Sequence, residues 1–212
     1  MNTKQDGFTL VEIAIVLLVV SLLLGGVMKG QELIDSAKVK NLGQDFRSIP
    51  AMVHAYQDKY RALPGDDRNA RMHLCPGSSE CTALGNGNGV IDGNWDDSSG
   101  SESVRFWQHL RLANVASGST DPDDAGFLPR NAVGGRVGVQ RGGTVLGIPG
   151  AMVVCSDAIV GKLVRQLDIA LDDGNPATGS MRAGTAGEGA LVPISATNPL
   201  DDSASHTVCA SL

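Results

Sequence analysis

Glu12 has the most distinctive chemical setting in this sequence, because it is the single charged residue between residues 8 and 28. The segment that follows it, residues 13–24, reads IAIVLLVVSLLL. A carboxylate inside an apolar helix costs about 2.5–3.5 kcal/mol at the centre of a bilayer and less near its edge. A simple membrane anchor gains nothing from that cost. We therefore interpret Glu12 as a functional group whose expected partner is a nearby ammonium group.

The apolar segment is long enough to cross a membrane. A helix of residues 8–28, at about 1.5 Å per residue, spans the roughly 30 Å hydrocarbon core of a bilayer. Composition alone leaves two simple interpretations open, a cleaved secretory signal peptide and a plain signal anchor. The leader carries Lys4, whose charge Asp6 partly cancels, and no A-x-A cleavage pattern follows the apolar run. Neither interpretation explains Glu12.

The residues around Glu12 form a recognisable string. Residues 7–12 read G-F-T-L-V-E, with a short polar leader before them and the apolar segment after them. This arrangement resembles the prepilin cleavage and methylation motif of type IV pilins and of the related type II secretion pseudopilins. The resemblance implies that a membrane-bound prepilin peptidase cuts after Gly7 and methylates the amino group of Phe8. It also implies that Glu12 pairs with the Phe8 amine of a neighbouring subunit during filament assembly.

Such a pairing would make Glu12 a register device, because two buried charges neutralise each other only when subunits stack correctly. The resemblance implies four kinds of partner: further copies of this chain or other pilins in a helical polymer, the prepilin peptidase, the inner-membrane assembly machinery, and the membrane before assembly. Lys4 favours a cytoplasmic amino terminus. The precursor is then expected in the bacterial inner membrane with a periplasmic head, and the assembled protein in an extracellular filament or a periplasmic pseudopilus.

A second pattern follows the apolar segment, where large apolar residues recur at alternating steps of four and three. These residues are Leu42, Phe46, Ile49, Val53, Tyr56 and Tyr60. That spacing predicts one buried face of a helix, so we expect a single helix from about residue 9 to residue 61. Gly25 and Gly26 weaken this helix where it leaves the membrane, and Pro50 is expected to kink it.

The chain is therefore expected to have four parts. They are a leader at 1–7, a transmembrane and filament-core helix at 8–30, the amphipathic half of the long helix at 31–62, and a globular head with long loops at 63–212. The head's own patterns predict an α+β fold in which a small antiparallel β-sheet lies on the long helix. The resemblance to pilins implies the same architecture.

Within the head, residues 63–100 look like a long loop, and two helices are expected after it. One is at 103–113 with Ser101 or Ser103 as its cap, and the other is at 158–171 with Asp157 as its cap. Strands are expected at 136–140, 144–148, 151–155, 180–183 and 190–194, with a hairpin turn at 141–143 between the first two.

The four cysteines are Cys75, Cys81, Cys155 and Cys209, and an even number in an exported domain predicts disulfides. Four cysteines allow three pairings. We favour Cys75 with Cys81, which closes a small ring, and Cys155 with Cys209, which would attach the carboxyl-terminal tail to the sheet. A zinc site is the alternative, but the spacings fit no common zinc finger.

Two acidic stretches are candidates for a cation site, and calcium is the cofactor they suggest. Asn86, Asn88 and Asp92 resemble the middle of a calcium loop, although the first and twelfth positions of the full template are not oxygen ligands. Asp96 and Asp97 could gather with them around a hard cation. We favour the other interpretation, a glycine-rich turn with solvated carboxylates.

Asp172 and Asp173 form the second acidic candidate. They precede a glycine directly after the expected helix at 158–171. A turn that ends the helix explains them as well as a cation site does, and we favour the turn.

Composition and motifs argue against several other functions. The net charge of −6 argues against a nucleic-acid-binding head, which usually needs a basic patch. The four histidines are scattered, and no hydrolase, zinc-protease or phosphate-loop pattern occurs, so we expect no enzyme.

The leading hypothesis is a structural subunit of a type IV pilus or pilus-like filament at the cell surface. A pseudopilin of a type II protein secretion system is the alternative with the same chemistry. An alternative of another class is a membrane-anchored periplasmic module that binds calcium or another ligand and never polymerises.

Overall fold

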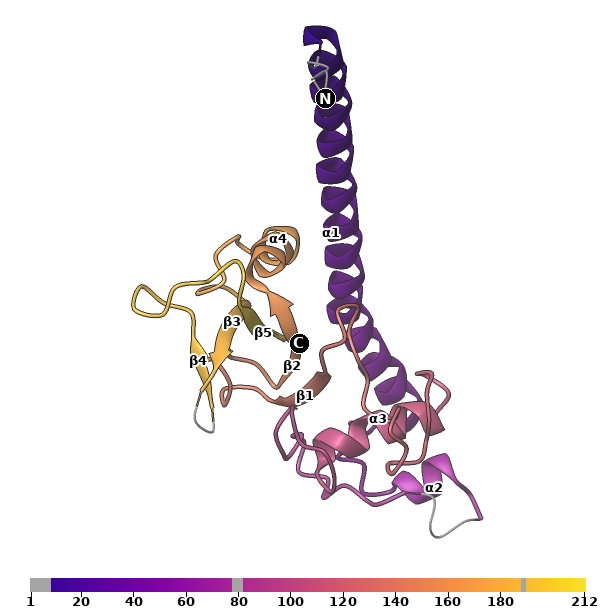
Figure 1. Ribbon diagram of the computed structural model, residues 1–212. Helices are drawn as coiled ribbons and strands as arrows, with labels where there is room; N and C mark the ends of the chain where they lie inside the picture. Colours follow the sequence, from indigo (N-terminus) through magenta and orange to yellow (C-terminus); the bar gives the residue numbers. More distant parts are fainter. Residues whose placement is uncertain (1–8, 78–81, 188–189) are drawn as a thin grey trace, which may run out of the picture. The chain divides into compact units, whose positions relative to one another are not determined.

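The computed structural model describes residues 9–77, 82–187 and 190–212. The chain divides into two compact units, Met1–Ala37 and Lys38–Leu212. One helix, α1 (Leu10–Tyr60), continues through the boundary between them (Figure 1). This confirms the single long helix expected from the sequence.

The first unit contains the apolar part of α1. This part is long and apolar enough to cross a membrane, with a mean hydropathy of 2.8 over its best 18-residue window and none of that window buried. Its large apolar side chains are exposed, and Leu22 keeps 70% of its surface accessible. The Ser21 hydroxyl donates to the Leu17 carbonyl oxygen at 2.8 Å, which satisfies the one polar side chain inside the run of residues 13–24.

The second unit begins with the amphipathic part of α1. The members of the predicted apolar stripe are buried, apart from a half-buried Tyr60 that packs against the same core. The helix continues through Pro50, which donates no backbone hydrogen bond. It ends at Tyr60, and the next residue, Arg61, turns the chain with a φ of +55°.

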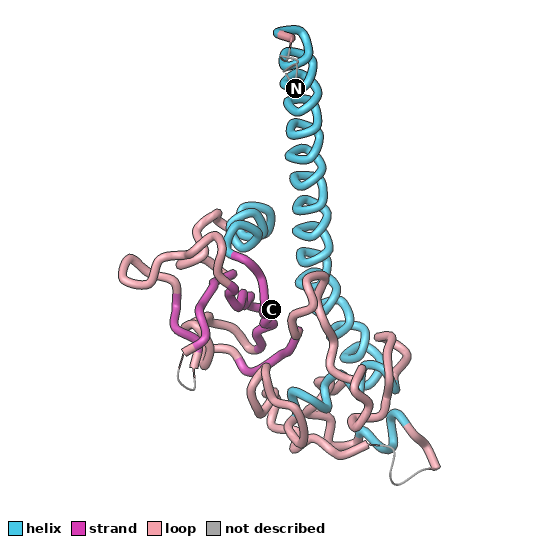
Figure 2. Tube along the Cα trace, in the orientation of Figure 1, coloured by secondary structure: helices cyan, strands magenta, loops and turns pink. Residues whose placement is uncertain are grey.

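Five strands form one antiparallel sheet in the order β1-β2-β5-β3-β4. They are β1 (Val137–Arg141), β2 (Met152–Val160), β3 (Met181–Ala186), β4 (Leu191–Pro193) and β5 (Ser205–Ser211). The last strand of the chain therefore lies in the middle of the sheet (Figures 1 and 2). The amphipathic part of α1 and this sheet share one core, which is the expected α+β, pilin-like arrangement.

The two faces of the sheet support two separate apolar clusters. Val139 and Val154 lie on the face that shares the main core with the helices. Val153 and Cys155 lie on the opposite face, in a smaller cluster that also contains Trp95. This division follows from the alternation of side chains along a strand. We call the second face the outer face of the sheet.

Three short helices accompany the sheet: α2 (Ala70–Leu74), α3 (Glu102–Leu112) and α4 (Gly161–Leu171). Helix α3 confirms the helix expected at 103–113, and Ser101 occupies its N-cap position, but no serine side chain makes the expected capping hydrogen bond. The hydroxyl groups of Ser101 and Ser103 are buried and make no hydrogen bond. Helix α4 lies against α1 at Gly43, where an added Cβ would stand 3.7 Å from Leu167.

The strand expected at 144–148 is wrong. These residues lie in the connection between β1 and β2, where Leu146 adopts a φ of +49° that no strand residue has. They are apolar because several of them cover the outer face of the sheet. The hairpin turn expected at 141–143 is wrong as well, since Arg141 still belongs to β1 and pairs with Met152.

The start expected for the second head helix is also wrong. Residues 158–160 continue β2 beyond an irregularity in its pairing, where Ala158 has a φ of +58°. Helix α4 consequently begins at Gly161. Asp157 does not cap it, because its Oδ1 accepts the backbone N–H of Arg136 at 2.9 Å.

Two elements were not expected at all. Helix α2 is a single short turn inside the stretch that looks like a loop. Strand β5, which reads SHTVCAS, has a weak apolar pattern and is recognisable mainly by the cysteine that we expected at the sheet. The weak strands expected at 180–183 and 190–194 correspond to β3 and β4.

Candidate functional site

Glu12 takes part in a reciprocal hydrogen-bonded cap at the start of α1. The backbone N–H and the hydroxyl of Thr9 donate to Glu12 Oε2, at 3.2 and 3.1 Å. In return, the Glu12 N–H donates to the Thr9 hydroxyl oxygen at 3.2 Å. This is a capping box, in which two helix-end donors are satisfied by side chains three residues apart.

The capping box has a consequence for the charge of Glu12. The Glu12 carboxylate is exposed and shares the positive end of the helix with the Thr9 amide. No cation of the described chain is paired with it. The carboxylate is thus held in place within its own subunit and remains accessible to a positive group from outside. The sequence analysis missed Thr9, although the T-x-x-E spacing could have revealed it.

The expected processing residues, Gly7 and Phe8, lie outside the described residues, as does the leader at 1–7. Their roles remain predictions of the motif.

The cysteines confirm one predicted pairing directly. Cys155 in β2 and Cys209 in β5 form a disulfide that joins the two central strands over a sequence separation of 54. Cys75 is also disulfide-bonded. Its expected partner, Cys81, lies outside the described residues.

The first acidic stretch is organised by two buried carboxylates that sequence reasoning missed. Asp66 accepts backbone N–H groups of Asn88 at 3.1 Å and Gly89 at 2.7 Å. Glu102, at the start of α3, accepts the N–H of Asn86 at 2.9 Å and of Asp92 at 3.0 Å. Asp66 precedes the N–H groups it accepts by more than twenty residues, and Glu102 follows its own by ten or more, so no local pattern indicates their role.

The structure brings Asn86, Asn88 and Asp92 together. Asp92 Oδ2 accepts the side-chain amides of Asn86 and Asn88, at 2.7 and 2.9 Å. The side-chain oxygens of both asparagines accept backbone N–H groups two residues further along the chain. Asp97 Oδ2 accepts the N–H of Asn94 at 2.9 Å, and the backbone carbonyl of Asp96 accepts the Arg136 guanidinium. The loop is therefore held by hydrogen bonds among its own residues and by those to Asp66 and Glu102.

The second acidic candidate behaves differently. Asp172 and Asp173 lie beside Asp168 of α4, and one carboxylate oxygen from each of the three lies within 4.8 Å of the others. Among the described residues, this is the group of acidic side chains with the geometry to hold a metal ion.

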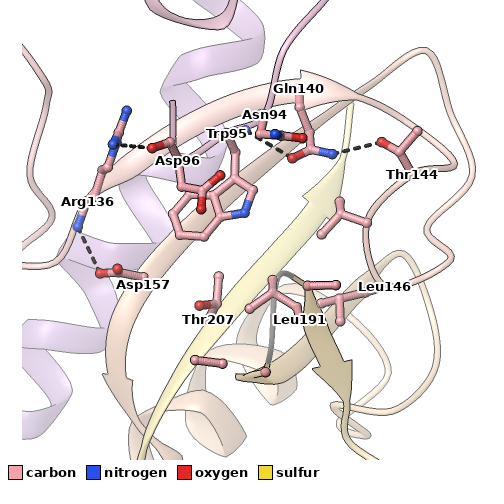
Figure 3. A pocket seen from close by; sticks show the side chains of 14 residues that line it. Asn94, Trp95, Asp96, Arg136, Gln140, Thr144, Leu146, Asp157, Leu191 and Thr207 are labelled. Atoms are coloured by element: carbon pink, nitrogen blue, oxygen red, sulfur yellow. Dashed lines mark hydrogen bonds between the residues drawn. The ribbon is translucent and has the colours of Figure 1, made fainter. Parts of the chain in front are cut away.

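A pocket of about 600 Å³ lies on the outer face of the sheet (Figure 3). Leu146 and Leu191 give it apolar walls, while Asp96, Arg136 and Asp157 give it a charged side. Figure 3 shows that the polar residues mainly bind one another: the Arg136 guanidinium donates to the Asp96 carbonyl oxygen at 2.6 Å.

A buried polar network ties the end of α1 to the head. Asp67 is 1% exposed at its side chain, and its Oδ2 accepts the Tyr56 hydroxyl at 2.8 Å. The same oxygen lies 2.7 Å from His73 Nδ1. Burial and the Asp67 carboxylate raise the pKa of Tyr56 well above its usual value, so Tyr56 stays a hydrogen-bond donor.

His109 completes this region as a neutral side chain. Its Nδ1 accepts the backbone N–H of Gly65 at 3.0 Å, and its Nε2 faces the carbonyl oxygen of Ala83 at 3.3 Å. Burial lowers the pKa of His109 to about 4. These partners fit the tautomer with the proton on Nε2. The network has a structural role, since it is enclosed at the junction of α1 and α3.

The comparison with known families concerns the amino-terminal part of the chain. A family model described as the prokaryotic N-terminal methylation motif matches residues 2–28. This motif is typical of type IV pilins and type II secretion pseudopilins. No curated protein and no solved structure matches the chain.

The motif and the fold together define a prepilin-like protein. Proteins of this kind are generally non-enzymatic structural subunits, and the motif implies processing by a prepilin peptidase. The apolar part of α1 is consistent with the inner-membrane precursor of such a protein.

Proposed function

We propose that this protein is a structural subunit of a type IV pilus or pilus-like filament. It is processed after Gly7, methylated at Phe8 and polymerised through the apolar part of α1. The observation that carries the proposal is the coincidence of the N-terminal methylation motif with an apolar helix whose most hydrophobic 18-residue window is unburied among the described residues.

The exposed apolar surface supports polymerisation. Large apolar side chains surround the helix, so no polar face remains for water over residues 10–28. A bilayer covers such a helix in the precursor. Once the subunit leaves the membrane, the same surface needs other apolar helices, and copies of this segment are the matching partner.

Glu12 supports a specific register within that packing. Glu12 follows the amino terminus that cleavage after Gly7 would create by four residues in the sequence. The Phe8 amine of a neighbouring subunit would neutralise the Glu12 carboxylate, and a misplaced neighbour would leave it unpaired in an apolar environment. The charge of Glu12 thus disfavours every packing of neighbouring helices except the one that places a Phe8 amine beside it.

The secretion pseudopilus remains the alternative, because it would use the same cleavage, methylation and helix packing. A membrane-anchored ligand-binding module is the alternative of another class. Neither alternative changes the expected location of the precursor in the inner membrane, with the head in the periplasm.

The processing step is tested by mass spectrometry of the mature amino terminus. We expect a chain that begins with methylated Phe8. A mature chain that retains Met1, or one that begins at another residue, contradicts the proposal.

The assembly step is tested with the variant Glu12→Gln, examined by electron microscopy of filaments purified from the native source. We expect processing to continue and filaments to disappear. Glu32→Gln is the matched control, because Glu32 is an exposed carboxylate further along α1 that pairs with Lys29 at the helix surface. Filaments of Glu12→Gln at the normal level contradict the proposed role of the Glu12 charge in assembly, whereas a chain that is absent from filaments even when unchanged favours the ligand-binding module.

Filaments on the cell surface separate a pilus from a secretion pseudopilus. A pilin is expected in sheared surface fibres. A pseudopilin is expected to co-purify with periplasmic secretion machinery, and its loss is expected to stop the export of secreted proteins.

A further inference from the structure

Asp168 breaks the pattern of the helix that carries it. Helix α4 buries one face, which contains Leu163, Val164 and Leu167, and Asp168 lies on that same face with only 1% of its surface exposed. Its Oδ1 is buried and accepts no hydrogen bond. A buried carboxylate oxygen without a partner costs considerable free energy unless a proton or a cation neutralises it. The position therefore points to a missing positive partner.

The charged groups that act on Asp168 are also acidic, and the backbone N–H groups of Gly174 and Asn175 offset only part of the rise in its pKa that burial and these charges cause. Asp172 directly follows α4 and Asp173 comes next, and ligand oxygens from all three lie within 4.8 Å of one another. Among the described residues, no ion pair involves any of the three. The last turn of α4 contains no basic residue. The carbonyl end of the helix adds further negative potential at the same place.

The following loop fixes the two outer carboxylates. Asp172 accepts the Ser180 hydroxyl at 3.1 Å and the Met181 N–H at 2.8 Å. Asp173 accepts the Thr178 hydroxyl at 2.7 Å. Gly179 has a φ of +74°, and a Cβ on it would collide with Asp172 Oδ2, so this close approach requires glycine. The carboxylates are thus held close together despite their mutual repulsion.

We propose that Asp168, Asp172 and Asp173 bind a divalent cation, and that this cation is calcium. The donors are all carboxylate oxygens, which hard cations prefer, whereas zinc would select histidine or cysteine. Calcium accepts irregular geometries with six to eight oxygens, including backbone carbonyls and water, and magnesium demands a near-ideal octahedron. A loop that supplies carboxylates from one helix end suits calcium better.

The position of the site indicates which segments a bound cation would hold together. Asp168 faces the core beneath the sheet, while Asp172 and Asp173 belong to the loop that leads into β3. A bound cation would fasten this loop to the end of α4. Burial, together with Asp173 and Asp172, raises the pKa of Asp168 to about 6, so a proton is the competing partner.

Calcium binding to the full-length protein in detergent, measured by isothermal titration calorimetry at pH 7.5, tests the inference. We expect one site with a Kd of about 10⁻⁵ to 10⁻³ M, and at least tenfold weaker binding of magnesium. Saturating calcium is expected to raise the Tm of the head by about 5–10 °C, and a chelator is expected to reverse the shift.

The variants Asp168→Asn and Asp173→Asn are each expected to weaken calcium binding at least tenfold. Asp173 is exposed, so its variant removes a ligand even if Asp168→Asn folds poorly. Asp123→Asn is the matched control, because the Asp123 side chain is an exposed carboxylate in another loop of the head. The control is expected to bind calcium as the unchanged protein does.

Absence of calcium binding up to 10 mM overturns the inference, as does equal affinity in Asp173→Asn and the unchanged protein. A rise of the Tm in Asp168→Asn without any calcium effect also overturns it, since the cluster would then hold a proton. All three residues lie in Lys38–Leu212, so these outcomes are independent of whether the apolar helix polymerises.

Discussion

Helix α1 contributes to both compact units, and its apolar residues are exposed in one unit and buried in the other. In Met1–Ala37, Leu22 keeps 70% of its surface exposed, and the neighbouring apolar residues are similarly open. In Lys38–Leu212, Leu42 on the same helix is completely buried beneath the head. One helix therefore offers an uncovered apolar surface at one end and an internal core face at the other. The uncovered end is the part of α1 for which we propose a bilayer and then neighbouring subunits as partners.

The acidic residues of the two units show the same contrast. Glu12 is exposed and is held by Thr9, so its charge remains accessible to another molecule. Asp168 is buried and is surrounded by residues of its own unit. We propose a neighbouring subunit as the partner of Glu12 and a cation as the partner of Asp168. In both units, a carboxylate without an opposite charge indicates where a partner is needed.

The largest expected effect concerns the disulfide of the second unit. Replacing Cys155 and Cys209 together by Ser should lower the free energy of unfolding by about 4 kcal/mol, because the closed loop is long. Guanidinium unfolding followed by tryptophan fluorescence measures this loss, since both tryptophans lie in the head. We expect a smaller loss for Cys75→Ser, whose ring with Cys81 would be short. Equal losses would contradict the importance of the long closure.

The comparison of the two ends of α1 is tested by a matched pair of leucine variants. Leu42→Ala creates a cavity in the head core and should cost about 3–4 kcal/mol. Leu22→Ala removes an exposed side chain and should change the unfolding free energy of the head by less than about 0.5 kcal/mol. Both are measured by the same unfolding experiment. A large loss in Leu22→Ala would show that the first unit supports the head directly.

Lowering the pH should reduce the free energy of unfolding of the head, because His109 is buried in its neutral form. Because burial lowers its pKa to about 4 while the unfolded value is near 6.5, the unfolded state binds the proton first as the pH falls. The contribution of neutral His109 is complete above pH 6.5 and should be lost between pH 6.5 and pH 4, on the order of 3 kcal/mol. The measurement is the difference in unfolding free energy between the unchanged protein and His109→Gln across this range.

The contribution of Asp168 to the free energy of unfolding changes with pH in the opposite direction. The pKa of Asp168 is raised to about 6, so in the absence of calcium its contribution favours the folded state at low pH and is lost as the pH rises from about 4 to about 6. The comparison with His109→Gln removes this effect, since both proteins contain Asp168. An identical pH dependence in the two proteins would show that His109 is protonated in the folded state.

The sequence predicted the helix of the first unit better than the head, and the physical reason is the distance in sequence between contacting residues. The motif of the first unit lies within residues 7–12, and its helix is recognisable from composition alone. The buried face from Leu42 to Tyr60 was equally easy to predict, because a helix repeats its contacts every three or four residues.

The head depends on contacts that no local pattern records. Asp66 holds a loop more than twenty residues away, and Asp168 looks like part of a helix surface until the burial of α4 is known. Residues 144–148 resemble a strand because they are apolar, but their burial comes from covering the outer face of the sheet. The outer face also depends on β5, which lies in the middle of the sheet between β2 and β3.

The smallest expected effect separates the positioning of Glu12 from its charge. Thr9→Ala removes the hydroxyl of the capping box and should destabilise the start of α1 by about 1 kcal/mol, whereas Thr9→Ser keeps the hydroxyl and should change it little. Hydrogen exchange of the full chain in lipid nanodiscs measures this at the Glu12 amide, which donates to the Thr9 hydroxyl. We expect about fivefold faster exchange in Thr9→Ala, while the head remains unaffected. If the exchange rate stays the same, Thr9 does not hold Glu12, and the carboxylate must be positioned by the neighbouring subunit alone.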